Sequence, residues 1–313
     1  MVMFVLRRVL AGIVLMFVIT SVAFLLLFVG AGDVGRNVLG QQATQADVAA
    51  LNEQLGLNRP LLTQYWDWLT TALTGDLGAS WFTGQQVTDA ISSRVAVTLS
   101  LVICATVITG IIGAVLGVWA AIRHGWVDKL VQTVTILGFA IPGFLIAVFL
   151  VLVFAINLGW FEPTGYVALS DDPLGWAKAI ALPVIALAIH SVASVANQVR
   201  GSVTDGLRQD YVRTLRSRGL PFNRVVFKHV LRNAGGPALA VLAVQFIGLL
   251  SGAIIVERVF AIPGLGDIAV TSTSQSDIPM VMGLVVAVAA IVVIVNLLID
   301  LLQGWLNPKV RLS

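Results

Sequence analysis

Long runs of apolar residues, separated by shorter polar segments, dominate the pattern along this chain of 313 residues. Six runs reach the roughly 20 residues that a helix needs to cross a hydrocarbon core about 30 Å thick. Because lipid offers the backbone no hydrogen-bond partner, runs of this length must be helical, and the alternation typical of barrel strands is absent. The pattern predicts an all-α polytopic membrane protein with six transmembrane helices. The runs cover 9–30, 95–122, 130–161, 179–199, 233–256 and 278–299.

The composition agrees, since 58% of the residues are hydrophobic, 11% are charged and the mean hydropathy is +0.94. These values exclude an ordinary soluble globular protein. The first run has an alternative reading as a secretory signal, because Arg7 and Arg8 precede it and small residues surround Ala31. It is longer than the usual signal core of about 7–15 residues, which favours a retained span. The single cysteine, Cys104, lies in the second run and is expected to be a small buried hydrophobe.

The distribution of basic residues predicts the orientation in the membrane. With the N-terminus inside, 14 of the 19 Lys and Arg fall in the segments that face the cytoplasm. Eight of these lie between positions 200 and 232. Basic residues favour the cytoplasmic side, so both termini are predicted to be cytoplasmic. The net charge of +3 is therefore a topology signal and does not indicate binding to nucleic acid.

The segment 31–94, between the first two runs, is predicted to contain two amphipathic helices. Thr44 is a candidate N-cap, with Asp47 three residues later and Gly56 as a stop. The second helix follows Pro60 and is expected to lie on the outer membrane surface or to pack over helix ends. Its apolar stripe comprises Leu62, Tyr65, Trp66, Leu69 and Leu73.

Few polar residues lie inside the runs, and no Asp, Glu, Lys or Arg lies well within a span. For the neutral polar residues we favour hydrogen bonds between helices over a direct functional role. The lack of a carboxylate well within any run weighs against an ion-coupled carrier, which usually has one near the midplane. The polar residues are His190, Asn197, Gln198, Gln245 and Asn296.

Small residues and one proline predict close packing and a bend. Gly113 and Gly117, and likewise Gly248 and Gly252, form GxxxG patterns that let helices approach closely. Pro142 lies within the third run, where its ring removes a backbone hydrogen bond and is expected to kink the helix.

The basic stretch 203–232 is predicted to form two short amphipathic helices on the cytoplasmic face. Val203, Leu207, Tyr211 and Leu215 recur every four residues as an apolar stripe. Gly219 can end the first helix with a positive φ, and Pro221 suits the first turn of the next. From the residues alone two interpretations remain: a hairpin that binds lipid headgroups, and a docking lever for a cytoplasmic partner.

Four ordered motifs give the chain a resemblance to a known family. The stretch "DYVRTLRSRG" at 210–219, followed by "HVLRN" at 229–233, resembles the cytoplasmic loop of B-type permeases in ATP-binding-cassette (ABC) importers of dipeptides and oligopeptides. The broader pattern of this loop is E-A-A, followed by Gly and then by I-x-L-P. This chain agrees with it only at Gly219 and Leu231. Arg213, Thr214 and Leu215 occupy the E-A-A positions. The N-terminal "MFVLRRVL", the external "LGLNRPLLTQYWDWL" with "GDLGASW", and "VERVFAIPGLG" at 256–266 also match. The resemblance covers nearly the whole chain.

The resemblance implies the fold of a type I ABC importer permease in the bacterial cytoplasmic membrane. Its parts would be 1–30 with the first transmembrane helix, the external loop 31–94, a five-helix core at 95–300 that contains the hairpin 203–232, and a cytoplasmic tail at 301–313. The hairpin would be the coupling helix, lodged in a groove of a cytoplasmic ATPase. The residues implied in this coupling are Asp210, Tyr211, Arg213, Thr214, Leu215, Arg216, Arg218, Gly219, Leu220, Pro221, His229 and Leu231.

A second segment, which is otherwise expected to be a plain re-entrant or surface loop, is implied as part of an external gate beneath a substrate-binding protein. Its residues are Glu257, Arg258, Phe260, Pro263, Gly264 and Gly266.

The resemblance also implies partners: a C-type permease that completes a heterodimer, one or two ABC ATPase chains, an extracytoplasmic binding protein and membrane lipid, with no nucleic acid. None of the four lysines follows a glycine as a phosphate-binding loop requires, so ATP and Mg are expected on the ATPase. We expect a non-catalytic subunit without a cofactor or metal of its own, which carries dipeptides or oligopeptides. The alternatives are the same role for another solute such as a nickel complex and, less favoured, a secondary carrier or a membrane scaffold.

Overall fold

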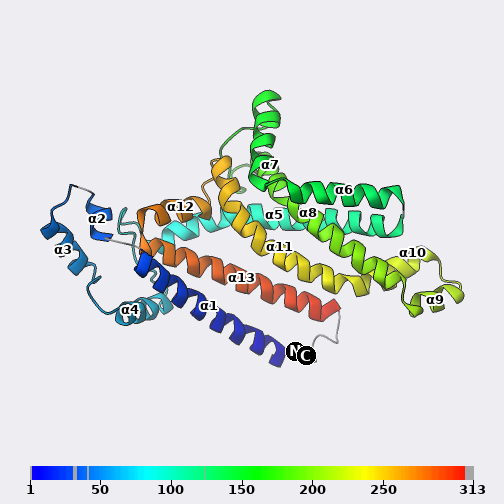
Figure 1. The fold of residues 1–313 in the computed structure, drawn as a ribbon, viewed down its shortest axis with the longest axis horizontal. Helices are drawn as coiled ribbons and strands as arrows, with labels where there is room; N and C mark the ends of the chain where they lie inside the picture. Colours follow the sequence, from blue (N-terminus) through cyan, green and yellow to red (C-terminus); the bar gives the residue numbers. More distant parts are fainter. Residues whose placement is uncertain (1, 31–33, 41, 124, 307–313) are drawn as a thin grey trace. The chain divides into compact units, whose positions relative to one another are not determined.

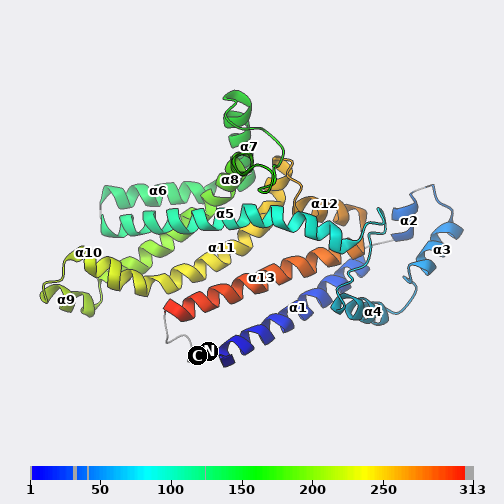
Figure 2. The ribbon, with the colours of Figure 1, turned by 180° about the vertical axis from the view of Figure 1, so that it is seen from behind.

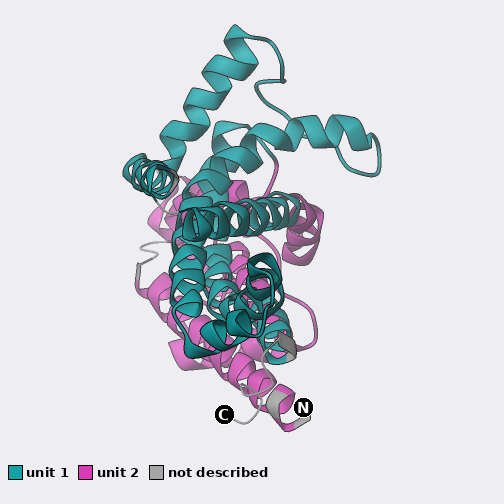
Figure 3. Cartoon of the chain, turned by 90° about the vertical axis from the view of Figure 1, so that its right-hand side faces the viewer, with its two compact units in different colours: residues 1, 98–262, 295–313 teal, residues 2–97, 263–294 magenta. Residues whose placement is uncertain are grey.

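A computed structural model describes residues 2–30, 34–40, 42–123 and 125–306. The chain divides into two compact units (Figure 3). Unit 1 comprises residues 1, 98–262 and 295–313, and unit 2 comprises residues 2–97 and 263–294. The regular elements of the described residues are helices, with one isolated bridge between Ala79 and Gln86. The predicted all-α fold is confirmed.

Unit 2 is built around an aromatic core. Phe24 of the first helix lies against Tyr65, with ring centroids 5.2 Å apart, and both are buried together with Met282. Aromatic pairs at this separation add to the free energy gained by burial alone. The helices of this unit are α1 (Val2–Gly30), α2 (Val34–Leu39), α3 (Gln45–Gln54), α4 (Leu61–Leu73), α12 (Leu265–Gln275), and the first parts of α5 (Val87–Ile122) and α13 (Ile278–Leu306).

The two helices predicted in segment 31–94 are present. Thr44 caps α3 through a capping box, in which its hydroxyl accepts the Asp47 N–H at 3.2 Å and the Asp47 carboxylate accepts the Thr44 N–H at 3.3 Å. The apolar stripe of α4 is only partly used: Tyr65 is buried, whereas Leu62 and Leu73 are each 80% exposed. A periodic apolar stripe predicts a helix, but it does not determine how many of the side chains in the stripe are buried by neighbouring residues.

Unit 1 holds the remaining helices, of which α6 and α11 run beside α8 (Figures 1 and 2). The first of them after α5 is α6, and at its end the chain turns into α7, which stands across the others (Figure 1). The hairpin α9–α10 lies at the opposite end of these helices. The elements are α6 (Trp126–Ala140), α7 (Gly143–Leu150) with a π-helical continuation η1 (Val151–Asn157), α8 (Pro173–Leu207), α9 (Asp210–Ser217), α10 (Phe222–Val225), a π-helical turn η2 (Val226–Val230) and α11 (Leu231–Val259).

Five of the six predicted spans are helices long and apolar enough to cross a membrane, and the third is a broken pair. The bend predicted at Pro142 is present and is sharper than a kink, because Asp128–Gly138 and Gly143–Asn157 meet at an angle of 93°. Pro142 lacks an N–H and disfavours helical geometry at Ile141, whose ψ is 120°. The proline therefore separates two helices where a kink was expected.

The first GxxxG pattern forms the predicted close contact, and the second does so less closely. A Cβ atom added to Gly117 in α5 would lie 2.6 Å from the carbonyl oxygen of Ala196 in α8, and one at Gly113 would lie 2.7 Å from the Val195 side chain. A Cβ at Gly252 would meet Leu187 at an ordinary 3.4 Å, and one at Gly248 would meet nothing within 4 Å. The glycines of α5 thus allow this helix to lie directly on α8.

Candidate functional site

The basic hairpin between α8 and α11 is present, but its second arm differs from the prediction. Gln209, in extended geometry, separates α8 from α9. The arm after Pro221 is the start of a single helical stretch, Phe222–Val259, which includes α10, η2 and α11. The prediction of a separate short second helix was wrong, because Gly235, Gly236 and Pro237, where such a helix could end, lie inside α11 and do not end it. The hairpin is therefore one short helix held between two long ones.

Gly219 sets the turn of the hairpin. Its φ is +82°, and its N–H donates to the Arg216 carbonyl oxygen at 3.0 Å. The N–H of Leu220 donates to the Leu215 carbonyl oxygen at 3.2 Å, which completes the Schellman arrangement of a helix C-terminus. A left-handed residue is required at this point, and glycine occupies it at no steric cost. The turn is therefore fixed by local backbone hydrogen bonds.

The apolar side of the hairpin packs on the chain itself. Val203, Val212, Val225 and Val230 are each 4% exposed or less and form one cluster. Partly buried side chains pack around this cluster, and they include four that the resemblance implied in coupling: Tyr211, Leu215, Leu220 and Leu231. The Tyr211 hydroxyl also accepts a 3.4 Å hydrogen bond from the Asn233 amide. This packing fixes α9 against the ends of α8 and α11.

The outer side of the hairpin is polar and basic. Arg213 and Asp210 lie 3.8 Å apart and are 83% and 96% exposed, so their attraction is screened by water. The guanidinium of Arg216 lies 5.7 Å from the centre of the Phe222 ring. His229 is half-buried. The surface left for a partner is formed by Asp210, Arg213, Thr214, Arg216, Arg218, Gly219 and Pro221, all exposed.

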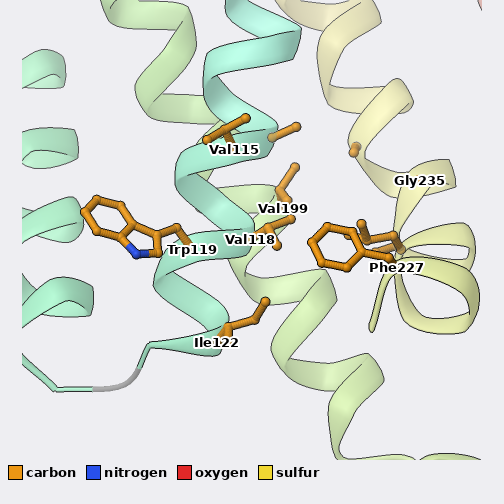
Figure 4. Close-up of a pocket in the computed structure, with 11 residues that line it drawn as sticks. Val115, Val118, Trp119, Ile122, Val199, Phe227 and Gly235 are labelled. Carbon is orange, nitrogen blue, oxygen red and sulfur yellow. The ribbon is translucent and has the colours of Figure 1, made fainter. Parts of the chain in front are cut away.

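An apolar pocket of about 550 Å³ lies next to the hairpin (Figure 4). Trp119 and Val115 of α5 line it together with Phe227 of η2 and Gly235 of α11. Every side chain of its lining is apolar, so it offers no charge to a solute. This pocket suits hydrocarbon and not the backbone of a peptide.

A second pocket, of about 490 Å³, lies where the break at Pro142 meets α8 and α11. Three polar side chains line it. The Ser191 hydroxyl donates to the Gln245 amide oxygen at 3.3 Å, and Nδ1 of His190 lies 3.3 Å from the Gly138 carbonyl oxygen. The predicted role of His190 and Gln245 in contacts between helices is confirmed, whereas the hydrogen bond from Gln198 goes to Ser202 in the same helix. We call this hollow the polar pocket.

The segment after α11 is more ordered than the expected plain loop. Glu257 is 1% exposed, and its backbone oxygen accepts the Ile262 N–H at 2.8 Å. The carbonyl oxygen of buried Phe260 accepts the Gly165 N–H at 3.1 Å. Residues 260–264 form the expected loop, and helix α12 begins directly after it at Leu265. Of the residues implied in a gate, Arg258 and Pro263 are exposed, and Gly264 and Gly266 are buried.

Comparison with known proteins identifies the family. The model of the "Binding-protein-dependent transport system inner membrane component" family matches residues 113–312, and the model of its N-terminal region matches residues 1–102. The chain belongs to this family. Its members are membrane components of ABC importers, and the chain is accordingly a multi-pass membrane permease.

Individual relatives match over nearly the whole length. A probable peptide ABC transporter permease of Sinorhizobium fredii is 34% identical over 309 residues, which is 98% of this chain and 99% of the relative. A putative peptide transport system permease of Brucella abortus is 35% identical over 98% of both chains. The glutathione transport system permease of Escherichia coli K12 is also 35% identical, again over 98% of both.

The fold is also that of a solved permease. A chain from the inward-facing MetNI methionine ABC transporter superposes with a TM-score of 0.53 at 16% identity. The match covers 69% of this chain and 97% of the MetNI chain. Together with the family match, this confirms the predicted type I importer permease fold.

Proposed function

We propose that this chain forms half of the membrane path through which an ATP-driven importer takes up small peptides. The relatives with matched lengths are named for the transport of peptides and of glutathione, which is itself a small peptide. The observation that carries the proposal is the basic hairpin, because it combines a rigid turn with an exposed surface. The chain itself catalyses no reaction in this scheme.

The hairpin serves as the contact for a cytoplasmic ABC ATPase. Its exposed arginines, Arg213, Arg216 and Arg218, give a partner charged groups to bind, and its packed inner side joins α9 to α8 and α11. A rigid connection is what a lever requires, since a flexible loop would absorb the movement of the ATPase. A hairpin that only bound lipid headgroups would need basic residues but no fixed turn. ATP and Mg reside on the ATPase.

The polar pocket is proposed as a point where the peptide passes. The amide of Gln245 and the hydroxyl of Ser191 match the donors and acceptors of a peptide backbone, and neither is charged. Neutral groups suit a permease that accepts peptides of varied sequence, because they recognise the backbone and not a side chain. Imidazole is a ligand that suits nickel, and the lining contains one, His190. Because a single imidazole is a small ligand set for a metal, the pocket favours a peptide over a nickel complex.

The orientation follows from the basic residues, with both termini and the hairpin in the cytoplasm. A second permease, of the C type, supplies the other half of the path. A binding protein delivers the peptide on the outer side, above segment 31–94 and the segment 257–277.

The test is uptake of a labelled dipeptide or tripeptide into liposomes that contain the complete importer. We expect uptake that depends on ATP and on the binding protein. Gln245→Leu should lower the uptake rate about fivefold, the effect of losing roughly 1 kcal/mol of hydrogen bonding, while ATP hydrolysis continues. Asn197→Leu is the matched control, because this exposed amide of α8 does not line the pocket.

Two results would count against the proposal in different ways. Unchanged uptake by Gln245→Leu would remove the polar pocket from the path. A complete wild-type importer that hydrolyses ATP without moving any peptide would overturn the proposed function.

A further inference from the structure

Helices α6 and α8 run antiparallel and are joined at two points. At one end, Arg200 of α8 binds Asp128 of α6 through Nε and Nη2, with Nη2 2.7 Å from Oδ2. At the other end, His190 of α8 meets the carbonyl oxygen of Gly138 in α6. On each helix the two contacting residues are ten positions apart, which corresponds to a rise of about 15 Å. The two helices therefore keep one register over this distance.

The contact between Asp128 and Arg200 is the stronger of the two contacts that join α6 to α8. Arg200 uses two donors and both carboxylate oxygens, an arrangement that fixes orientation as well as distance. The side chains are 28% and 19% exposed, far less than the pair Arg213–Asp210. The Gln132 amide, one turn along α6, donates to the same two carboxylate oxygens at 3.2 Å each. The carboxylate is therefore held from two helices.

This ion pair lies between the two parts of the candidate site. Val203, less than one turn after Arg200, belongs to the buried cluster of the hairpin. At the far end of α6 the chain reaches the break, where Ile141 and Pro142 line the polar pocket. A movement of the hairpin that turned or shifted α8 would thus carry α6 along, provided that the two helices stay joined.

We propose that Asp128 and Arg200 are positioning residues that transmit movement of the hairpin to the helix break at the polar pocket. The ion pair holds α6 to α8, so that both helices shift as one body when the ATPase moves the hairpin. Without it, α8 moves while α6 and the break lag behind. This inference rests on the proposed function of the hairpin.

The first test measures the number of peptides taken up per ATP hydrolysed by the complete importer in liposomes. We expect Arg200→Gln and Asp128→Asn each to lower this ratio at least about fivefold, the lower end of typical coupling between sites. The exchange D128R/R200D should restore most of it, because it rebuilds the pair with reversed charges. Lys129→Gln is the matched control, since it removes an exposed charge next to Asp128 and leaves the pair intact.

The second test does not need transport of peptide. A cysteine is placed at Leu145, an exposed position at the start of α7, in a Cys104→Ser background. Its rate of reaction with a maleimide is then compared between ATP-free importer and importer trapped with ATP and vanadate. We expect trapping to change this rate in the parent and not in Arg200→Gln, although Arg200→Gln still traps nucleotide.

The outcomes separate this inference from a purely structural role and from the proposed function. Arg200→Gln that keeps the parental ratio of peptide to ATP would overturn the inference. The same follows if D128R/R200D restores the amount of assembled importer but not the ratio, because the pair then only stabilises the fold. Failure of peptide uptake by the parent, with the Leu145 response intact, would reject the substrate and leave the transmission in place.

Discussion

The hydroxyl of Thr98 donates a 2.6 Å hydrogen bond to the carboxylate of Glu257, which joins α5 to the last turn of α11 within unit 1. Glu257 is 1% exposed, and Thr98 is 3% exposed. A buried carboxylate is stable only where hydrogen bonds replace its hydration. Although Glu257 lies in the segment implied as a gate, these contacts assign it a role as an anchor.

We therefore expect Glu257→Ala to destabilise the protein, because it removes the acceptor of the Thr98 hydroxyl and opens a cavity. The cost of losing this buried hydrogen bond is on the order of 1–3 kcal/mol. The unfolding midpoint of the importer in detergent, followed by a thermal fluorescence assay, should fall. Glu257→Gln retains an oxygen that accepts the Thr98 hydrogen bond and should lose clearly less. Equal midpoints for the alanine variant and the parent would show that the contact contributes little.

The turn at Gly219 yields a prediction about coupling. Gly219→Val should insert into the membrane but hydrolyse ATP without matching uptake, because a β-branched residue at a φ of +82° is strained and the turn must rearrange. Space is not the limit, since a Cβ atom added at this position would meet nothing within 4 Å. Gly219→Asn should therefore remain close to the parent, because asparagine tolerates left-handed geometry. Normal uptake by the valine variant would contradict the role of the hairpin as a lever.

The glycines of α5 and α11 form a matched pair for a stability experiment. Gly117→Ala places a methyl group 2.6 Å from the carbonyl oxygen of Ala196, and the helices must separate. Overpacking of this kind costs typically about 1–3 kcal/mol. Gly248→Ala, with nothing within 4 Å, should be tolerated. The yield and thermal midpoint of the purified protein should distinguish the two, and a similar loss in both would contradict the close contact between α5 and α8.

Features that depend on neighbouring residues could be predicted from the sequence. The cap at Thr44 and the turn at Gly219 are governed by hydrogen bonds within five positions along the chain. The prolines show the limit of this reasoning. Pro142 separates two helices, whereas Pro183 and Pro237 lie inside α8 and α11 without ending them. All three prolines lack the backbone N–H, so the packing around each of them decides whether the helix continues.

In the candidate site, too, the sequence predicts the local features but not the tertiary contacts. Periodicity identified the stripe with Tyr211 and Leu215, but not that it would pack on Val212 and Val230 of the same chain. His190 and Gln245 stood out as polar residues in apolar runs, yet Ser191 and the break at Pro142 join them only through tertiary packing. The ion pair of Asp128 and Arg200 had no sequence signal, because 72 positions separate its members.

A buried carboxylate in unit 2 gives a test of both local order and orientation. Asp277 is 2% exposed and accepts hydrogen bonds from the Ser80 hydroxyl and from the Trp81 N–H at 3.3 Å. The Ser80 oxygen in turn accepts the N–H groups of Phe82 and Thr83 at 3.2 and 3.0 Å. The segment after α4 is thus held to the start of α13 through one acidic side chain.

Asp277→Ala should release this segment and make its aromatic residues accessible to chymotrypsin. Losing about 1.4 kcal/mol of local stability would speed cleavage at Trp81 and Phe82 about tenfold. In vesicles of native orientation only protease added outside should cut, because segment 31–94 is proposed to be external. Asp277→Asn retains one acceptor and should be intermediate, and Asp76→Ala controls for charge, since its carboxylate accepts a hydrogen bond from nearby Gly78. Cleavage solely by protease enclosed within the vesicles would reverse the proposed topology.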